Sequence, residues 1–158
     1  MNSLLVKEWM RTEVVTVNPE LRVERAWELM ERQRIRHLSV VQHGRLIGMV
    51  TERDLKRAVF AASPLVTVWK EGKPQPTGTP GDLPVQAIMT QGASTAKPTD
   101  MLLSTALRML NEKIGALPVV GDAGRLVGLL SQTDLLKALV LLLERNHLAP
   151  PAREDLPQ

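Results

Sequence analysis

A single stretch of sequence occurs twice in this chain, and the two copies lie 80 residues apart. Residues 44–58 read GRLIGMVTERDLKRA, and residues 124–138 read GRLVGLLSQTDLLKA. Each copy predicts a turn at its first glycine, then a short apolar strand, and then a helix with apolar residues every three or four positions. A chain that repeats such a unit is expected to fold as two related halves and to carry its function at two related places.

A hydroxyl residue and a carboxylate mark the junction between strand and helix in both copies. These are Thr51 with Asp54 and Ser131 with Asp134. The spacing is that of a capping box, in which the hydroxyl and the acid accept hydrogen bonds from each other's backbone amides. The same geometry can serve a ligand, because a helix N-terminus attracts phosphate and a carboxylate can accept hydrogen bonds from ribose hydroxyls. The spacing leaves both interpretations open.

The residues that precede the two copies are duplicated as well, at an offset of 79. Apolar positions in residues 6–10 and 85–89 have helical spacing and predict short docking segments that belong to the core. Residues 14–19 and 94–98 each predict a short extended run that ends at a proline. The duplication therefore covers most of each half.

Between these segments the pattern predicts one long helix and one further strand in each half. An amphipathic helix is predicted over residues 23–33, because its apolar residues recur at intervals of three and four. The best match pairs Ala26 with Ala106, which implies one inserted residue ahead of the second helix. Residues 35–41 and 114–120 follow as strands, and each leads through a glycine turn into a β-hairpin.

Composition and charge argue against several classes of protein. The 158 residues include no cysteine, so neither a disulfide framework nor a thiolate site is possible. No run reaches the roughly 18 apolar residues of a membrane span, and we expect a cytoplasmic protein without a membrane partner. Basic and acidic side chains are mixed, with 11 and 8 in residues 1–60 and 5 and 4 in residues 85–143. Nucleic-acid binding is not expected, because it usually needs a one-sided basic stripe.

Catalysis is not expected either. His37, His43 and His147 are isolated in the sequence, without a second metal ligand at a typical spacing and without a triad pattern. The chain has no Walker loop and no Gly-x-Gly-x-x-Gly motif, so no cofactor is expected to be required. Asp54 and Asp134 could act as an acid and a base, but they belong to different copies of the repeat.

The order of motifs closely resembles a known domain. Each half contains a short helix, an extended run with proline, an amphipathic helix, Leu-x-Val-Val, and a strand that ends in Thr/Ser-x-x-Asp-Leu. This order resembles the cystathionine-β-synthase (CBS) domain, present as a tandem pair over residues 5–60 and 84–142. The chain also resembles stand-alone bacterial CBS pairs of the acetoin-utilisation type, on residues 5–10 and 63–69.

The resemblance implies a fold and a domain organisation. The fold class is α+β, with two βαββα repeats packed pseudo-symmetrically and small sheets flanked by helices. Repeat 1 is expected in residues 1–60, a connector in 61–84, repeat 2 in 85–143 and a flexible tail in 144–158. CBS pairs typically bind adenosine-containing ligands in two clefts between the repeats and act as regulatory modules without chemistry of their own.

The resemblance also implies roles for individual residues. Asp54 and Asp134 match the acid that holds ribose hydroxyls, and Thr51 and Ser131 match the hydroxyl that touches ribose or phosphate. The backbone of a strand edge is expected to contact adenine, at Thr16 and Val17 and at Thr95 and Ala96. His37 and Ala116 match a position that faces the ligand. The expected ligand-binding residues are Thr16, Val17, Arg36, His37, Thr51, Arg53, Asp54, Thr95, Ala96, Ala116, Ser131, Thr133 and Asp134.

The two expected clefts differ in charge. The first is expected to be surrounded by side chains that suit phosphate, because arginine offers paired hydrogen bonds: Arg34, Arg36, His37 and Arg53. The matching positions of the second are Lys113, Gly115, Ala116 and Thr133. A di- or triphosphate should therefore prefer the first cleft, and a less charged adenosyl ligand, or none, the second. The alternative is that Arg32, Arg34 and Arg36 form a solvated face.

The connector and the last helix complete the chain. Five prolines and three glycines in residues 61–84 predict a short ordered patch at Val66–Trp69 and an exposed, mobile loop from Lys70 to Asp82. Residues 135–143 are apolar nearly all round, and such a helix needs cover on more than one side. We expect a second subunit to supply it, since CBS pairs commonly form dimers through their helices.

Two functions are consistent with these observations. The first is a sensor of an adenosine-containing ligand (AMP, ADP, ATP or S-adenosylmethionine) that passes a change in dimer geometry to an effector protein. The second is a constitutive dimerisation or scaffold module, in which the Thr/Ser-x-x-Asp motifs only cap helices.

Overall fold

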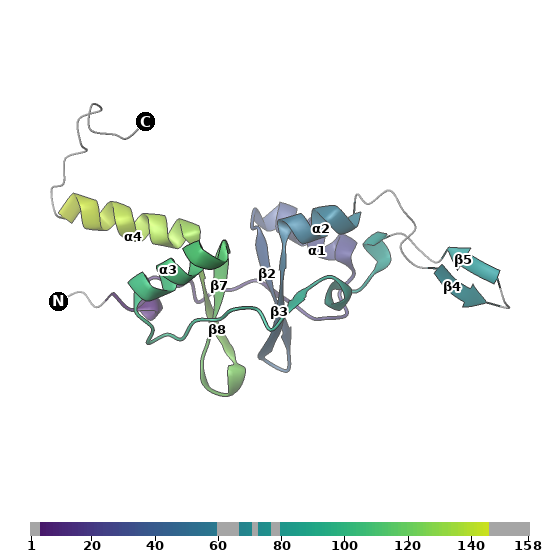
Figure 1. The fold of residues 1–158 in the computed structure, drawn as a ribbon, viewed down its shortest axis with the longest axis horizontal. Coiled ribbons are helices and arrows are strands. Elements are labelled where there is room, and N and C mark those ends of the chain that lie inside the picture. The colour runs from purple at the N-terminus through teal and green to yellow at the C-terminus, as the bar shows by residue number, and fades with distance from the viewer. Residues whose placement is uncertain (1–3, 60–66, 71–72, 77–79, 146–158) are drawn as a thin grey trace, which may run out of the picture.

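A computed structural model describes residues 4–59, 67–70, 73–76 and 80–145. Repeat 1 runs through β1 (Thr16–Val17), α1 (Val23–Gln33), β2 (His37–Gln42), β3 (Arg45–Thr51) and α2 (Glu52–Val59). Repeat 2 runs through α3 (Leu102–Glu112), β7 (Ala116–Val120), β8 (Leu126–Ser131) and α4 (Gln132–Arg145), and a single parallel bridge from Ala96 to Val119 takes the place of its first strand. Figure 1 shows the two halves side by side, which confirms the α+β fold of two βαββα repeats.

The sheet of repeat 1 contains a strand from outside the repeat. Its order is β1-β2-β3-β6, with β1 parallel to β2 and the other neighbours antiparallel. The added strand, β6 (Thr90–Gln91), belongs to the segment that leads into repeat 2. Repeat 2 has the same arrangement in reduced form, because Arg11 makes a single antiparallel bridge to Leu129 on β8. Each sheet is thus completed by a segment that precedes the other repeat.

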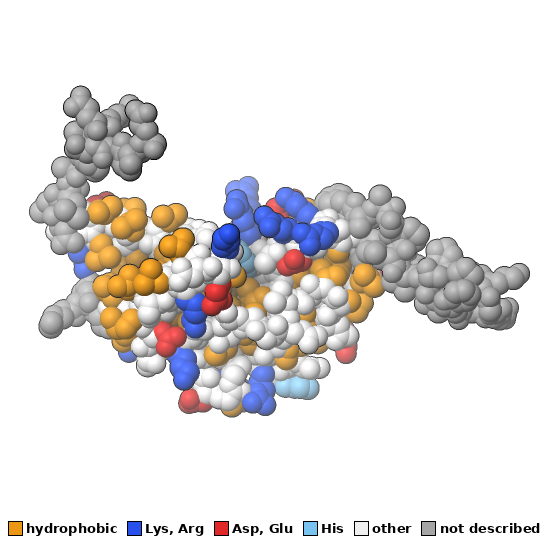
Figure 2. Space-filling view, in the orientation of Figure 1, with side chains coloured by type: hydrophobic (Ala, Val, Ile, Leu, Met, Phe, Trp, Pro, Cys, Tyr) orange, Lys and Arg blue, Asp and Glu red, His pale blue; other side chains and the backbone are white. Residues whose placement is uncertain are grey.

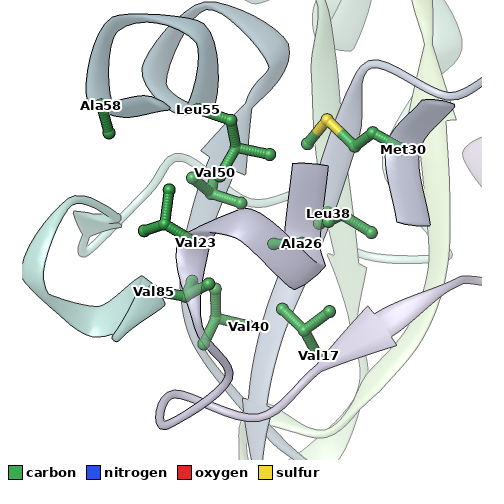
Figure 3. Close-up of a cluster of buried hydrophobic side chains, with 10 residues drawn as sticks. All are labelled: Val17, Val23, Ala26, Met30, Leu38, Val40, Val50, Leu55, Ala58 and Val85. Carbon is green, nitrogen blue, oxygen red and sulfur yellow. The ribbon is translucent and has the colours of Figure 1, made fainter. Parts of the chain in front are cut away.

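The short helices at the start of each half are exchanged in the same way. Val6, on the 3-10 helix η1 (Val6–Glu8), is fully buried in the core of repeat 2 with Leu117 and Leu130. Val85, on η3 (Val85–Ala87), is fully buried in the core of repeat 1, where Figure 3 shows it beside Val40. The prediction that these segments dock as core is confirmed, and their exchange means that neither repeat contains its whole core.

Two glycines make room for the exchanged segments. A Cβ atom at Gly48 would lie 2.6 Å from Met89 Sδ and 2.9 Å from the Thr90 carbonyl oxygen. A Cβ atom at Gly128 would lie 2.6 Å from Met10 Sδ. Because such distances are too short for a carbon atom, any side chain at these strand positions would force the exchanged segment to shift.

The predicted insertion before the second long helix is wrong. Both α1 and α3 have eleven residues and are related by 79 positions, so the buried Ala26 matches the buried Thr105 and not Ala106. The Thr105 hydroxyl donates a hydrogen bond to the Met101 carbonyl oxygen at 2.9 Å. Because this bond satisfies the hydroxyl within the helix, threonine can take an alanine position in the core.

The connector departs from the predicted loop. Within residues 70–82, Lys70 ends β4 (Thr67–Lys70), which pairs antiparallel with β5 (Lys73–Pro76), and the 3-10 helix η2 follows at Pro80–Asp82. Figure 1 shows this hairpin beyond the end of repeat 1. Prolines are tolerated in β5 because a two-stranded hairpin leaves one edge of each strand without a partner strand. Val66, and residues 146–158 of the predicted tail, lie outside the described residues.

The outer faces of the helices differ between the repeats. Exposed basic side chains of α2 include Arg53, Lys56 and Arg57, whereas α3 and α4 expose large apolar side chains. Figure 2 shows this apolar patch over α3 and α4. It contains Leu103, Leu107, Leu110, Leu136, Leu139, Val140 and Leu143. In the part of the chain that the structure describes, no helix is both long and apolar enough to span a bilayer.

Candidate functional site

Two pockets lie where the repeats meet. The larger, of about 590 Å³, is lined by Thr51, Glu52 and Arg53 of repeat 1 and by residues of repeat 2, and we call it the Thr51 pocket. The smaller, of about 460 Å³, is lined by Ser131, Thr133 and Asp134 of repeat 2 and by residues of repeat 1, and we call it the Ser131 pocket. Between them, Met49, Ala116 and Leu129 form a small apolar cluster that joins the sheets.

Both capping boxes are formed. Asp54 Oδ2 accepts hydrogen bonds from the Thr51 amide at 2.9 Å and the Thr51 hydroxyl at 2.6 Å, and the Asp54 amide donates to that hydroxyl at 3.3 Å. Asp134 Oδ2 accepts from the Ser131 amide at 2.9 Å and the Ser131 hydroxyl at 2.5 Å, and the Asp134 amide donates to that hydroxyl at 3.4 Å. The capping interpretation is therefore confirmed. It leaves room for a ligand, because these bonds to each carboxylate end on one oxygen only.

The two acids are not equally placed. Asp134 is 4% exposed and lines the Ser131 pocket. Asp54 is half-buried, and among the described residues it is not one that lines the Thr51 pocket, although its partner Thr51 does. Thr133 and Arg53, which occupy equivalent positions, line the Ser131 and Thr51 pockets respectively.

The adenine contacts expected at the strand edges stay a prediction. Val17 and Ala96 are buried in the cores of repeats 1 and 2, and neither they nor Thr16 and Thr95 are among the described residues that line these two pockets. The lining comes instead from just before them. Val14 and Val15 line the Ser131 pocket, and Ala93 and Ser94 line the Thr51 pocket.

The exchange of segments explains why residues that precede one repeat line the pocket of the other. The offset of 79 relates Arg11 to Thr90, but it carries no information on which repeat each residue contacts. The backbone bridges place Arg11 on β8 and Thr90 on β3. Each segment therefore serves the pocket of the opposite repeat.

The basic side chains cross over as well. Arg34 and Lys113 occupy equivalent positions in the two repeats. They end α1 and α3 in left-handed conformation, with φ of 52° and 54°. Arg34 lines the Ser131 pocket and Lys113 lines the Thr51 pocket, which is the reverse of the predicted assignment. The prediction of a more basic first cleft is also wrong. The Thr51 pocket has Arg36, Arg53 and Lys113 with two acids, and the Ser131 pocket has Arg11, Arg34, Arg36 and Lys137 with two acids.

The comparisons with known proteins agree with this fold. The family model of the CBS domain matches the chain twice, over residues 6–61 and 85–141. The chain belongs to the CBS-domain family. It is 30% identical over 142 residues to a CBS domain-containing protein of Dictyostelium discoideum, a match that covers 89% of this chain and 94% of that protein.

Solved structures of CBS proteins are similar too. One is of a Vibrio cholerae protein assigned to acetoin utilization (AcuB), with a TM-score of 0.74 and 27% identity, covering 94% of this chain and 99% of that one. Another is the cytosolic domain of the Mg²⁺ channel MgtE in complex with ATP, with a TM-score of 0.62 and 25% identity, covering 82% of this chain and 46% of that one. Both parts of the predicted resemblance are thereby confirmed.

The wall between the two pockets of this CBS pair is shared. Arg36 and His37 line both pockets, as does Gly115, while Ala116 lines the Thr51 pocket alone. A Cβ atom on Gly115 would lie 2.9 Å from His37 Nε2, so the imidazole packs against the space that glycine leaves. Burial, and then the positive charges of Arg36 and Arg11, lower the pKa of His37. The imidazole is therefore neutral at pH 7 and offers one donor and one acceptor.

The Ser131 pocket of the CBS pair also contains an ion pair between the repeats. Arg11 Nε lies 3.5 Å from Asp134 Oδ2, and Arg11 Nη2 donates a hydrogen bond to the Ser131 hydroxyl at 3.4 Å. Across the described ranges, no group of three or more His, Cys, Asp or Glu residues could hold a metal ion. The arginine and lysine side chains of the pockets can bind anions, and the carboxylate of Asp134 can accept hydrogen bonds from hydroxyl groups.

Proposed function

We propose that this CBS pair is a regulatory module that binds an adenosine-containing ligand between its repeats and does no chemistry of its own. One observation carries the proposal. Each pocket joins the capping box of one repeat, at Thr51 or Ser131, to a basic side chain at the helix end of the other, Lys113 or Arg34.

The chemistry of a nucleotide matches these groups. Asp134 can accept hydrogen bonds from ribose hydroxyls, because its bonds within the capping box end on Oδ2. Phosphate suits the arginine and lysine side chains of the Ser131 pocket. Both pockets, at about 590 and 460 Å³, fall in the size range of small-molecule sites.

A similar structure supports the ligand class. The MgtE domain, at 25% identity, was solved in complex with ATP. AMP, ADP, ATP and S-adenosylmethionine are the candidates for this chain, and the basic side chains of both pockets favour the phosphorylated ones.

We further propose that the chain forms a homodimer through α3 and α4, in the cytoplasm, and signals to an effector protein through the geometry of that dimer. Support comes from the exposed apolar side chains of both helices, such as Leu107 and Leu136. Apolar patches of this kind are typical of protein interfaces. A ligand can change the dimer only if it binds two geometries with different affinity.

A constitutive scaffold is the second candidate function. The observation that favours it is that both capping boxes are complete without a ligand, so each of Thr51, Asp54, Ser131 and Asp134 already has a structural role. In that case the apolar face of α3 and α4 would be the functional surface among the described residues.

A thermal-shift experiment separates the two functions. The wild-type chain is heated with AMP, ADP, ATP or S-adenosylmethionine, and so are Asp54→Asn and Asp134→Asn. Ligand at 100 times its Kd stabilises the native state by about 2.7 kcal/mol, which raises Tm by several degrees. The sensor predicts such a rise and its loss in one of the two variants, with Asp122→Asn, an exposed turn residue outside both pockets, as the control. If protein shown to be free of nucleotide gives no shift with any compound, the scaffold is the function.

A further inference from the structure

Arg11 is the residue that most distinguishes the two pockets. Its backbone is fixed on repeat 2, because the Arg11 amide donates to the Leu129 carbonyl oxygen at 3.0 Å and the Leu129 amide donates back at 2.9 Å. Its side chain, 49% exposed, crosses from the segment before repeat 1 to the Asp134 carboxylate, which is 5% exposed. The acid that is expected to hold ribose therefore already has a cationic partner.

The equivalent place in the other pocket holds no charge. Thr90 pairs with Met49 on β3, as Arg11 pairs with Leu129 on β8, and Thr90 lines the Thr51 pocket. Asp54 is hydrogen-bonded to Thr51. Within the part of the chain that the structure describes, no lysine or arginine forms an ion pair with Asp54.

The difference has a consequence for an incoming ligand. A nucleoside without phosphate that hydrogen-bonds to Asp134 must share the carboxylate with Arg11 or displace it. Displacement takes the guanidinium away from its counter-charge and leaves it beside Arg34, Arg36 and Lys137, which repel it, with Glu13 as the one other acid among the described residues that line the pocket. A phosphate group supplies a new acceptor for Arg11, so the ligand restores the charge balance that it disturbs.

We propose that Arg11 makes the Ser131 pocket selective for phosphorylated adenosine ligands, whereas the Thr51 pocket, with Thr90 at the equivalent position, also accepts adenosine ligands without phosphate. This inference rests on the proposed function, since it assigns a ligand class to each of the two pockets. Arg11 acts as a specificity-determining residue: it selects against the uncharged ligand and binds the charged one.

The test compares adenosine with AMP by isothermal titration calorimetry. The Ser131 pocket is isolated in an Asp54→Asn background and the Thr51 pocket in an Asp134→Asn background. In the Ser131 pocket AMP should bind tighter than adenosine by roughly tenfold or more, the effect of one charge-assisted hydrogen bond. Arg11→Thr installs the residue found at position 90. It should weaken the binding of AMP and strengthen the binding of adenosine, so that the ratio of the two affinities falls by roughly tenfold.

Three further variants make the test specific to Arg11. Lys137→Thr removes another cation of the same pocket and should weaken AMP without strengthening adenosine. Thr90→Arg should increase the preference of the Thr51 pocket for AMP over adenosine. Arg11→Gln keeps N–H donors but loses the charge, and it must lose the AMP preference as Arg11→Thr does.

The possible failures are distinguishable. If AMP and adenosine bind but Arg11→Thr and Arg11→Gln leave their affinity ratio unchanged, the role of Arg11 is refuted and the proposed function stands. If neither compound binds to the wild-type chain or to any variant, both the role of Arg11 and the proposed function are refuted.

Discussion

The outer faces of the two repeats differ far more than their buried faces. At the outward positions of α1 the chain has Glu24, Glu28 and Glu31, and at the equivalent positions of α3 it has Leu103, Leu107 and Leu110. Lys56 on α2 is matched by the exposed Leu136 on α4. The buried positions remain apolar or internally hydrogen-bonded in both repeats. The buried face of each helix therefore determines the fold, while the outer face is free to determine whether the repeat contacts water or another protein.

The largest expected effect is on self-association, when leucines on the outer face of α3 are replaced by the glutamates found on α1. Leu107→Glu combined with Leu110→Glu should weaken self-association by roughly 100-fold or more, because each buried leucine contributes about 1.5–3 kcal/mol. Sedimentation velocity over a range of concentrations measures the dimer. Glu28→Gln combined with Glu31→Gln, at the equivalent positions of α1, should leave it unchanged. A wild-type chain that sediments as a monomer would contradict the proposed dimer.

The next largest effect is on stability, and it compares how the two repeats hold their exchanged segments. Gly48→Ala and Gly128→Ala should each lower the free energy of unfolding by about 1–3 kcal/mol, because the new Cβ atom collides with an exchanged segment. Urea denaturation measures both. Gly124→Asn is the control, since a Cβ atom at this position would meet no other part of the protein within 4 Å and asparagine tolerates its φ of +73°. Unequal losses at positions 48 and 128 would show that one segment is held more tightly than the other.

A smaller effect distinguishes the two capping boxes. Asp54→Ala should cost about 1 kcal/mol of unfolding free energy, the usual value of a lost helix cap. Asp134→Ala should cost about 1 kcal/mol more, because it also removes the partner of Arg11 and leaves a buried hydroxyl with one acceptor fewer. Denaturation of both variants at the same pH and salt measures the difference. Equal costs would mean that the Arg11–Asp134 pair contributes nothing to stability.

The smallest effect concerns the wall that the pockets share. The native state lowers the pKa of His37. As the pH decreases, the unfolded chain, in which a histidine has a pKa of about 6.5, is therefore protonated at a higher pH than the native state. This group is neutral in both states above pH 6.5, and its contribution to stability falls as the pH decreases below that value. His37→Ala, which installs the residue of repeat 2, should remove this component of the pH dependence. Parallel denaturation series at decreasing pH compare the variant with the wild type, and identical slopes would refute the assignment.

The sequence predicted the local structure well. The helix over residues 23–33 has those same bounds in the structure, because its buried residues Val23, Ala26 and Met30 repeat at helical spacing. Both capping boxes were predicted because their two partners are only three residues apart. The proline-containing strand β5 was missed, since proline lowers strand propensity wherever its hydrogen-bonding edge is not known.

The sequence could not predict which segments meet across the two halves. Arg34 and Lys113 were placed in the wrong pockets, because a repeat offset relates equivalent residues but says nothing of contacts between copies. The helix alignment failed at Ala106 for a related reason. The identical residue type favoured an alignment of Ala26 with Ala106. In the structure the buried position equivalent to Ala26 is Thr105.

The exchange of the short helices also fixes the order in which the protein can be completed during synthesis. Val6 is made more than 100 residues before its buried neighbours Leu117, Leu130 and Ala138. Repeat 1 likewise lacks Val85 until the connector has left the ribosome. Because contacts so far apart along the chain form slowly, the growing chain holds exposed apolar surface until these later residues have been made. The first helix of the fold is thus among the last to reach its native contacts.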